Sequence, residues 1–178
     1  PLLYDLTQLQ RDANRKFGWP ASKTLKIAQT LYEQAKVITY PRTDSKYLSS
    51  DMKKSLPDRL EKLNQGKWKK FATLALASER ELFPRVINNK GVTDHHAIIP
   101  TGSAAAIEKL EGNELRLFDL IACRFIAVFL EDQIIEKTEI LTRCEGHAFL
   151  TRGRRVTQPG WSAVYGKSGN DKHLEEEP

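Results

Sequence analysis

Apolar residues recur every three or four positions over most of residues 1–130, which is the spacing of amphipathic helices. The first two stripes consist of Leu6, Leu9, Ala13 and Phe17, and of Leu25, Ala28, Leu31, Tyr32 and Ala35. Asp5 and Ser22 stand where the N-caps of these helices belong, and Gly18 stands where the first helix needs a left-handed residue to end. The two stripes therefore predict a helix-turn-helix pair.

Three further stretches have helical spacing. A helix capped by Ser49 or Ser50 is expected to reach Leu63, with a kink or a split at Pro57. The next is marked by Trp68, Phe71, Leu74, Ala75 and Leu82. Residues 113–130 carry the widest apolar stripe, so this helix is expected at the centre of the core. Residues 84–101 have little periodicity and predict a loop, followed by a short Ala-rich helical turn.

Beyond residue 132 the hydrophobic period changes from about 3.6 to two. Thr138–Cys144 and His147–Arg152, joined by Glu145 and Gly146, predict a β-hairpin, and Trp161–Tyr165 predicts one more element. The expected fold class is therefore α+β. We expect a mainly helical domain over residues 1–131 and the start of a β-rich domain over residues 132–178, ending in a polar linker from Gly166 onward.

Composition narrows the function classes. The 178 residues are 40% hydrophobic and 29% charged, which is typical of a globular protein and excludes disordered and collagenous classes. A net charge of +5 favours a polyanionic partner, and the second helix has a basic side at Lys23, Lys26 and Lys36. No apolar run is long enough to span a membrane, so we expect a cytoplasmic protein whose two cysteines fill core or strand positions.

Two segments combine side chains that could carry chemistry. The string Tyr40-Pro41-Arg42-Thr43-Asp44-Ser45 contains a phenol, a guanidinium, two hydroxyls and a carboxylate. Pro41 favours extended backbone at Tyr40, which would place Arg42 beside Tyr40 on the same side of the segment. The loop segment Asp94-His95-His96 offers imidazoles that donate to phosphate or move protons near neutral pH. Taken singly, each of these residues is more often a packing or ion-pair residue; the pair of motifs favours a catalytic site.

Together the two motifs resemble the active-site region of type IA DNA topoisomerases, most closely the topoisomerase III branch, and the likeness covers nearly the whole chain. The resemblance implies an ATP-independent enzyme that cleaves one DNA strand, passes another through the gap and reseals the cut, which changes DNA topology. Tyr40 would attack the phosphodiester and form a 5′-phosphotyrosyl bond. Arg42 would bind the phosphoryl oxygens, and His95, or else His96, would contact the phosphate. The DNA-binding residues implied in this way are Arg42, Thr43, Asp44, Ser45, His95 and His96.

The resemblance also implies the surroundings of this site. The helical part would be a winged-helix-like catalytic domain, and the hairpin would open the arch domain. Family members bind Mg²⁺ in a Toprim domain through a glutamate and an Asp-x-Asp pair, and this sequence contains no Asp-x-Asp pair. We therefore expect no metal ligands in this sequence. We expect the chain to be part of a longer monomeric enzyme, which has Toprim and arch domains of its own and acts on single-stranded DNA. Without the Toprim domain, this chain alone is expected not to relax DNA.

Other readings explain part of the sequence. A non-enzymatic winged-helix regulator would account for the basic charge and the helix-turn-helix pair, and would bind duplex DNA without covalent chemistry. A tyrosine recombinase would form its covalent bond to a 3′-phosphate, and a purely structural helical domain would form none. The end of the DNA that becomes attached to protein separates these classes.

Overall fold

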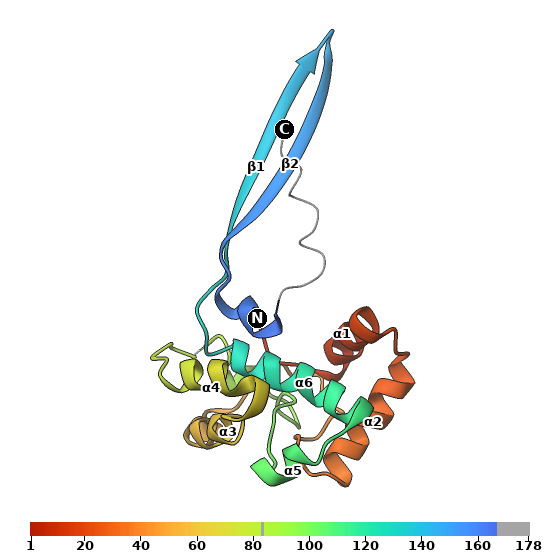
Figure 1. Cartoon of the computed structure of the whole chain (residues 1–178), viewed down its shortest axis with the longest axis vertical. Coiled ribbons are helices and arrows are strands. Elements are labelled where there is room, and N and C mark those ends of the chain that lie inside the picture. Colours follow the sequence, from red (N-terminus) through yellow and green to blue (C-terminus); the bar gives the residue numbers. More distant parts are fainter. Residues whose placement is uncertain (83, 167–178) are drawn as a thin grey trace. The chain divides into compact units, whose positions relative to one another are not determined.

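The structure, a computed structural model, describes residues 1–82 and 84–166. The chain divides into two compact units, Pro1–Leu130 and Glu131–Pro178. The first unit is helical and the described part of the second is a β-hairpin followed by a short 3-10 helix (Figure 1). The predicted α+β fold class is thereby confirmed. The segment from 167 onward, expected as a polar linker, lies outside the described residues.

The first unit contains six described α-helices joined by short 3-10 helices and extended segments. They are α1 (Leu6–Phe17), α2 (Ala21–Glu33), α3 (Leu56–Lys62), α4 (Lys69–Leu76), α5 (Ala104–Glu108) and α6 (Gly112–Ala127). The 3-10 helices are η1 (Ser50–Ser55), η2 (Gly66–Trp68) and η3 (Asn89–Gly91). Figure 1 shows the other α-helices arranged around α6.

The ends of α1 are those that the sequence predicts. The carboxylate of Asp5 accepts a hydrogen bond from the Gln8 backbone N–H at 2.6 Å, and Gly18 adopts a left-handed φ of 69°. The predicted cap of α2 is wrong, because the helix begins at Ala21 and Pro20, not Ser22, is its N-cap. Pro20 has an extended ψ of 155°, and its carbonyl already accepts the N–H of the first helical turn.

Of the kink or split expected at Pro57, the structure shows a split: η1 ends at Ser55, and Pro57 lies in the first turn of α3, where its missing N–H needs no partner. The expectation that the next helix extends to Leu82 is wrong, because α4 ends at Leu76. The chain leaves the helix at Ser78, whose hydroxyl donates to the Phe129 carbonyl at 2.7 Å. Leu82 is buried, but it belongs to an irregular segment and not to the helical stripe.

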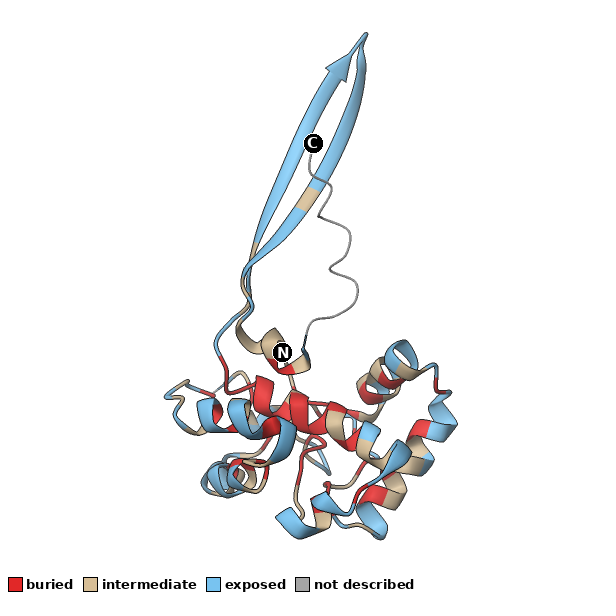
Figure 2. Cartoon of the chain, viewed as in Figure 1, coloured by how far each residue is buried: buried red, intermediate tan, exposed pale blue. Residues whose placement is uncertain are grey.

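Helix α6 forms the centre of the core, as its wide apolar stripe predicts. Leu117, Phe118, Ile121 and Phe125 are fully buried, and α6 packs against α1, α2 and α4 (Figure 2). The Phe118 ring meets the Trp68 ring edge to face at a centroid distance of 5.5 Å. Burial of α6 on several faces supplies the rigid base on which the loops of this unit are mounted.

The two cysteines have different environments, which predicts different reactivities. Cys123 on α6 is buried, and burial together with the nearby Asp119 carboxylate raises the pKa of its thiol to about 12. Cys144 is exposed. Only the thiolate is a good nucleophile. We therefore expect the exposed Cys144 thiol to react rapidly with a disulfide reagent at pH 8, and the buried Cys123 thiol to react only after unfolding. Cys144→Ser should remove the rapid phase, and rapid reaction of both thiols in the folded chain would contradict this expectation.

The second unit is built on the predicted hairpin, which is longer than its sequence pattern suggests. Strands β1 (Ile134–Cys144) and β2 (His147–Gln158) are antiparallel. Glu145 and Gly146 form the turn with φ values of 48° and 82°, as a two-residue hairpin turn requires. The 3-10 helix η4 (Gly160–Tyr165) follows. No helix in residues 1–82 and 84–166 is long and apolar enough to cross a membrane.

Candidate active site

The segment that carries Tyr40 is fixed by pairing with residues 97–101. The Thr39 N–H donates to the Ile99 carbonyl at 3.0 Å, and the Thr101 N–H donates to the Val37 carbonyl at 2.8 Å. The Thr39 hydroxyl donates to the Ala97 carbonyl and accepts the Ile99 N–H, both at 3.0 Å. Since these bonds use both backbone and side chain, the residue before Tyr40 is held firmly.

The same 97–101 segment is supported from α3. Arg59 donates from Nη1 to the Pro100 carbonyl at 2.8 Å and from Nε to the Ser55 hydroxyl at 3.3 Å. Burial lowers the pKa of the Arg59 guanidinium, and the neighbouring Asp58 carboxylate acts in the opposite direction. Arg59 therefore acts here as a structural support that links α3 to the segment paired with Thr39.

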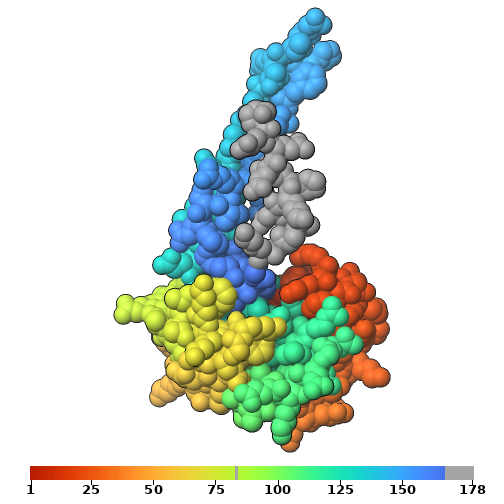
Figure 3. All heavy atoms as spheres, viewed as in Figure 1, coloured from red at the N-terminus to blue at the C-terminus, as the bar shows by residue number. Residues whose placement is uncertain are grey.

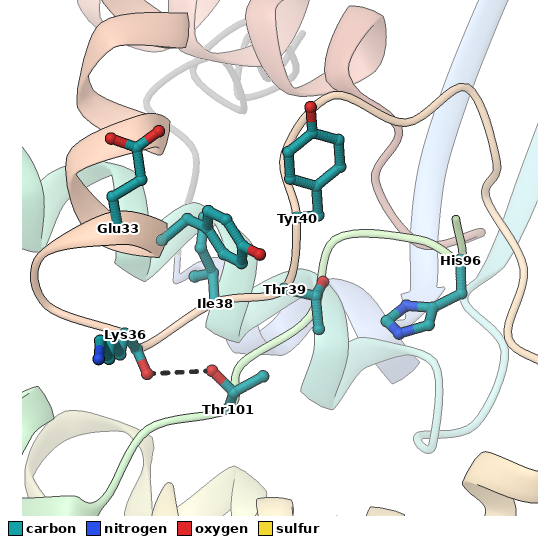
Figure 4. Close-up of a pocket in the computed structure, with 8 residues that line it drawn as sticks. Glu33, Lys36, Ile38, Thr39, Tyr40, His96 and Thr101 are labelled. Atoms are coloured by element: carbon teal, nitrogen blue, oxygen red, sulfur yellow. Dashed lines mark hydrogen bonds between the residues drawn. The ribbon is translucent and has the colours of Figure 1, made fainter. Parts of the chain in front are cut away.

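The ring of Tyr40 lies between two other aromatic rings. The Tyr32 ring, near the end of α2, meets it edge to face at a centroid distance of 5.4 Å, and the His95 ring lies at 4.5 Å. Tyr40 lines an open hollow of about 600 Å³, and its phenol oxygen points away from the hydrogen bond between Lys36 and Thr101 (Figure 4). The other lining residues are Tyr32, Glu33, Lys36, Ile38, Thr39, His96 and Thr101.

Arg42 lies in a neighbouring hollow and not in that of Tyr40. A bend at the buried Pro41 separates the two residues, so Arg42 lines a hollow of about 430 Å³. The other residues of this second hollow are Leu6, Thr7, Thr43, Asp44, Thr93, Asp94 and His95. Arg42 and Asp44 are exposed. The alternation that would place Arg42 directly beside Tyr40 is thus interrupted by the bend, and His95 is the residue common to Tyr40's contacts and Arg42's hollow.

Thr43 and Ser45 are buried, and their hydroxyls hold the loop together. The Thr43 hydroxyl donates to the His95 carbonyl at 3.0 Å and accepts the Ser45 N–H at 3.1 Å. The Ser45 hydroxyl donates to the Gly91 carbonyl at 2.7 Å. Asp44 points elsewhere and accepts a hydrogen bond from the Thr93 hydroxyl at 3.3 Å. These contacts fasten the Tyr40 string to the histidine loop, so the two sequence motifs meet in space.

The two histidines differ in exposure and in hydrogen bonding. His95 is exposed, while His96 is half-buried, with its ring Nδ1 2.8 Å from the Ala97 carbonyl oxygen. Because a carbonyl only accepts, Nδ1 of His96 carries the proton in this bond. His95 contacts the Tyr40 ring and lines the hollow of Arg42, whereas His96 lines only the hollow of Tyr40. His95 is therefore the better placed of the two to face a group bound next to Tyr40 and Arg42.

Sequence reasoning missed Glu33 and Lys36 as neighbours of Tyr40. Both lie at or just beyond the end of α2 and line the hollow. Lys36 has a φ of 54°, which is uncommon for a residue other than glycine. The chain turns there so that Val37 pairs with Thr101. The only available signal was the short distance in sequence between the end of the helix and Tyr40.

A metal site is not formed by the described side chains. Within residues 1–82 and 84–166 no group of three or more histidine, cysteine, aspartate or glutamate side chains could hold a metal ion. Asp44 and Asp94 line the second hollow without a third such carboxylate from the described chain. These residues therefore do not fit the Mg²⁺ ion that the resemblance implies.

Comparisons with known proteins show the family to which the chain belongs. A family model described as DNA topoisomerase matches residues 1–178. DNA topoisomerase 3 of Bacillus subtilis strain 168 is 41% identical over 177 residues, and its Bacillus licheniformis counterpart is 42% identical over 176. Each match covers 99% of this chain and 24% of the relative. The solved structure of full-length topoisomerase I from Thermotoga maritima matches 99% of this chain and 29% of its own, at 25% identity and a TM-score of 0.63.

The α+β fold and a family match along residues 1–178 place the chain in a class of DNA enzymes. The chain belongs to the DNA topoisomerase family, among its type IA members. It spans about a quarter of the length of the curated relatives that it matches. A family match along the entire chain does not favour a non-enzymatic regulator.

Proposed function

We propose that this chain supplies the nucleophilic tyrosine of a type IA DNA topoisomerase, an enzyme that changes DNA topology by cutting, passing and resealing single strands without ATP. The observation that carries the proposal is the position of Tyr40, whose ring contacts His95 and lines an open hollow on a firmly paired segment. Similarity to DNA topoisomerase 3 along 99% of the chain supports the same activity.

In the proposed reaction, the Tyr40 phenol oxygen attacks a phosphorus atom of single-stranded DNA. A bond forms between that oxygen and phosphorus, and the bond from phosphorus to the 3′-oxygen breaks, which leaves a 5′-phosphotyrosyl link and a 3′-hydroxyl. In resealing, the 3′-hydroxyl attacks phosphorus and the phenol regains its proton. A phenol is a weaker nucleophile than its anion, so attack requires an acceptor for its proton.

Arg42 and His95 are proposed to stabilise the phosphate under attack. The Arg42 guanidinium is exposed in the hollow next to that of Tyr40 and is suited to hold two phosphoryl oxygens. His95 lies between the two residues and would contact the same phosphate. His96 and Asp44 would contact neighbouring parts of the strand. Thr43 and Ser45, whose hydroxyls bond to loop carbonyls, would act on DNA by holding this surface in shape.

The remaining parts of the proposal concern the longer enzyme. The helical unit would be a winged-helix-like catalytic domain, and the hairpin would begin the arch domain. Any Mg²⁺ would be bound by a separate Toprim domain, so this chain alone would not relax DNA. We further propose a monomer that acts in the cytoplasm.

The proposal is tested by looking for the covalent intermediate. A polypeptide that carries this chain together with its Toprim domain is incubated with Mg²⁺ and single-stranded DNA labelled in turn at each end, and then denatured. We expect a protein–DNA adduct through a 5′-phosphate. An adduct through a 3′-phosphate would favour the recombinase, and reversible duplex binding with no adduct would favour the regulator.

Replacement of Arg42 by lysine tests its proposed role. Lysine keeps the positive charge but loses the two-pronged geometry, so Arg42→Lys should slow single-turnover cleavage of single-stranded DNA by about tenfold or more. Arg11→Lys, an exposed arginine on α1, serves as the matched control and should cleave at the parental rate. Equal rates for the two variants would exclude bidentate phosphate binding by Arg42.

A further inference from the structure

Three cations surround an aromatic pair at the turn between α1 and α2, away from the chemistry proposed for Tyr40. The rings of Phe17 and Trp19 lie 4.6 Å apart. The Arg116 guanidinium, from α6, is 4.6 Å from the Phe17 ring and 5.7 Å from the Trp19 ring. The Lys16 ammonium is 5.7 Å from Phe17, and the Lys23 ammonium is 4.8 Å from Trp19. We call Lys16, Lys23 and Arg116 the cation cluster.

The turn that presents the cation cluster is rigid. Gly18 adopts the left-handed conformation, and the Asn14 amide donates to the Trp19 carbonyl at 3.0 Å. The Gln10 amide donates to the Ala21 carbonyl at 3.1 Å, which ties α1 to the start of α2. Trp19 is buried, so it serves as a fixed platform for the cations and not as a surface for stacking bases. Such preorganisation lowers the entropic cost of binding a ligand.

The charge of the cation cluster is not neutralised within the described part of the chain. All three members are exposed, and none of them has a carboxylate oxygen within 4.0 Å in residues 1–82 and 84–166. Cations held close together repel one another, and the aromatic faces compensate for this only in part. An anion with several charges would relieve this repulsion, which makes a polyanion the best-matched ligand.

Helix α2 joins the cation cluster to the Tyr40 hollow. Lys23 is in its first turn, and Tyr32, whose ring packs on Tyr40, is near its last residue. Nine residues of helix correspond to about 14 Å. In Figure 3 the atoms of α1 and α2, in red and orange, lie on the same side of the first unit as the green atoms of α5 and the start of α6.

We infer that the cation cluster binds the phosphate backbone of the DNA strand cleaved at Tyr40, a few nucleotides from the cut. This inference rests on the proposed function. The contact is with phosphates and is independent of base sequence, because the cluster offers ammonium and guanidinium donors and no amide side chains among its three members. It adds affinity and fixes the direction of the strand along α2.

The inference is tested by the salt dependence of DNA binding. Binding of the full chain to a fluorescent 20-nucleotide poly-dT strand is measured by anisotropy at several salt concentrations. The triple variant Lys16→Gln, Lys23→Gln, Arg116→Gln should lower the slope of log K against log salt by about 2, since each phosphate contact contributes about 0.7 for single strands. A control triple variant, Lys53→Gln, Lys54→Gln, Lys109→Gln, removes the same charge from exposed positions elsewhere and should retain the parental slope.

A third variant separates lost charge from lost folding. Lys16→Arg, Lys23→Arg, Arg116→Lys keeps all three charges and should bind as the parent does. Equal slope changes in the two glutamine triples, or no binding by the parent chain, would overturn the inference. Neither result would bear on the cleavage chemistry, because the 5′-adduct assay in the longer polypeptide reports on Tyr40 independently.

Discussion

Tyr40→Phe is expected to reduce formation of the 5′-linked DNA adduct by more than about a thousandfold, because phenylalanine keeps the ring but has no oxygen to attack phosphorus. The ring contacts with Tyr32 and His95 need no hydroxyl, so the variant should fold normally and bind single-stranded DNA with parental affinity. Adduct formation is measured in the longer, Mg²⁺-supplied polypeptide, and binding is measured by anisotropy on the same DNA.

Variants of two other tyrosines test whether the loss of adduct is specific to Tyr40. Tyr47→Phe, outside the hollow of Tyr40, serves as the matched control and should leave adduct formation unchanged. Tyr32 is the second phenol that lines the hollow, and its ring lies 5.4 Å from that of Tyr40. If Tyr32→Phe abolished the adduct while Tyr40→Phe retained it, Tyr32 would be the nucleophile and the assignment made from the sequence string would be wrong.

Local signals in the sequence predicted local structure well. Asp5 and Gly18 mark the ends of α1 because capping depends on residues within one turn. Pro57 separates η1 from α3 for a similarly local reason. The end of α4 was mispredicted because it depends on a distant partner: the Ser78 hydroxyl bonds to the Phe129 carbonyl, and the stripe that continued to Leu82 gave no sign of this.

The candidate site shows the same contrast between local features, which the sequence reveals, and contacts between distant residues, which it does not. The chemistry of Tyr40 and His95 was visible in two motifs, but their 4.5 Å ring contact depends on Thr39 pairing with residues 97–99, far away in sequence. No periodicity encodes that pairing. Strand alternation placed Arg42 beside Tyr40, whereas the bend at Pro41 directs it into the neighbouring hollow. Identities of reactive groups are thus readable from sequence, while their mutual placement depends on tertiary contacts.

The ion pair between Asp12 and Arg124 predicts the largest effect on stability. Arg124 on α6 donates to the Asp12 carboxylate of α1 at 2.8 Å, and the two side chains are only 16% and 12% exposed. The guanidinium lies 4.2 Å from the centre of the Tyr4 ring, and the Tyr4 hydroxyl donates to Asp12 at 2.8 Å. The Tyr4 carbonyl in turn accepts the Ile98 N–H, so this network also supports the histidine loop.

Asp12→Ala should lower the free energy of unfolding of the full chain by about 3 kcal/mol, because it leaves a largely buried guanidinium without its carboxylate. Asp58→Ala removes the exposed pair with Lys62 and should cost less than about 1 kcal/mol. Urea denaturation measures both. Asp12→Ala combined with Arg124→Met should recover part of the loss, since the largely buried guanidinium is removed together with the Asp12 carboxylate. Equal losses for Asp12→Ala and Asp58→Ala would show that the network joining α1, α6 and the histidine loop contributes no more than a surface ion pair.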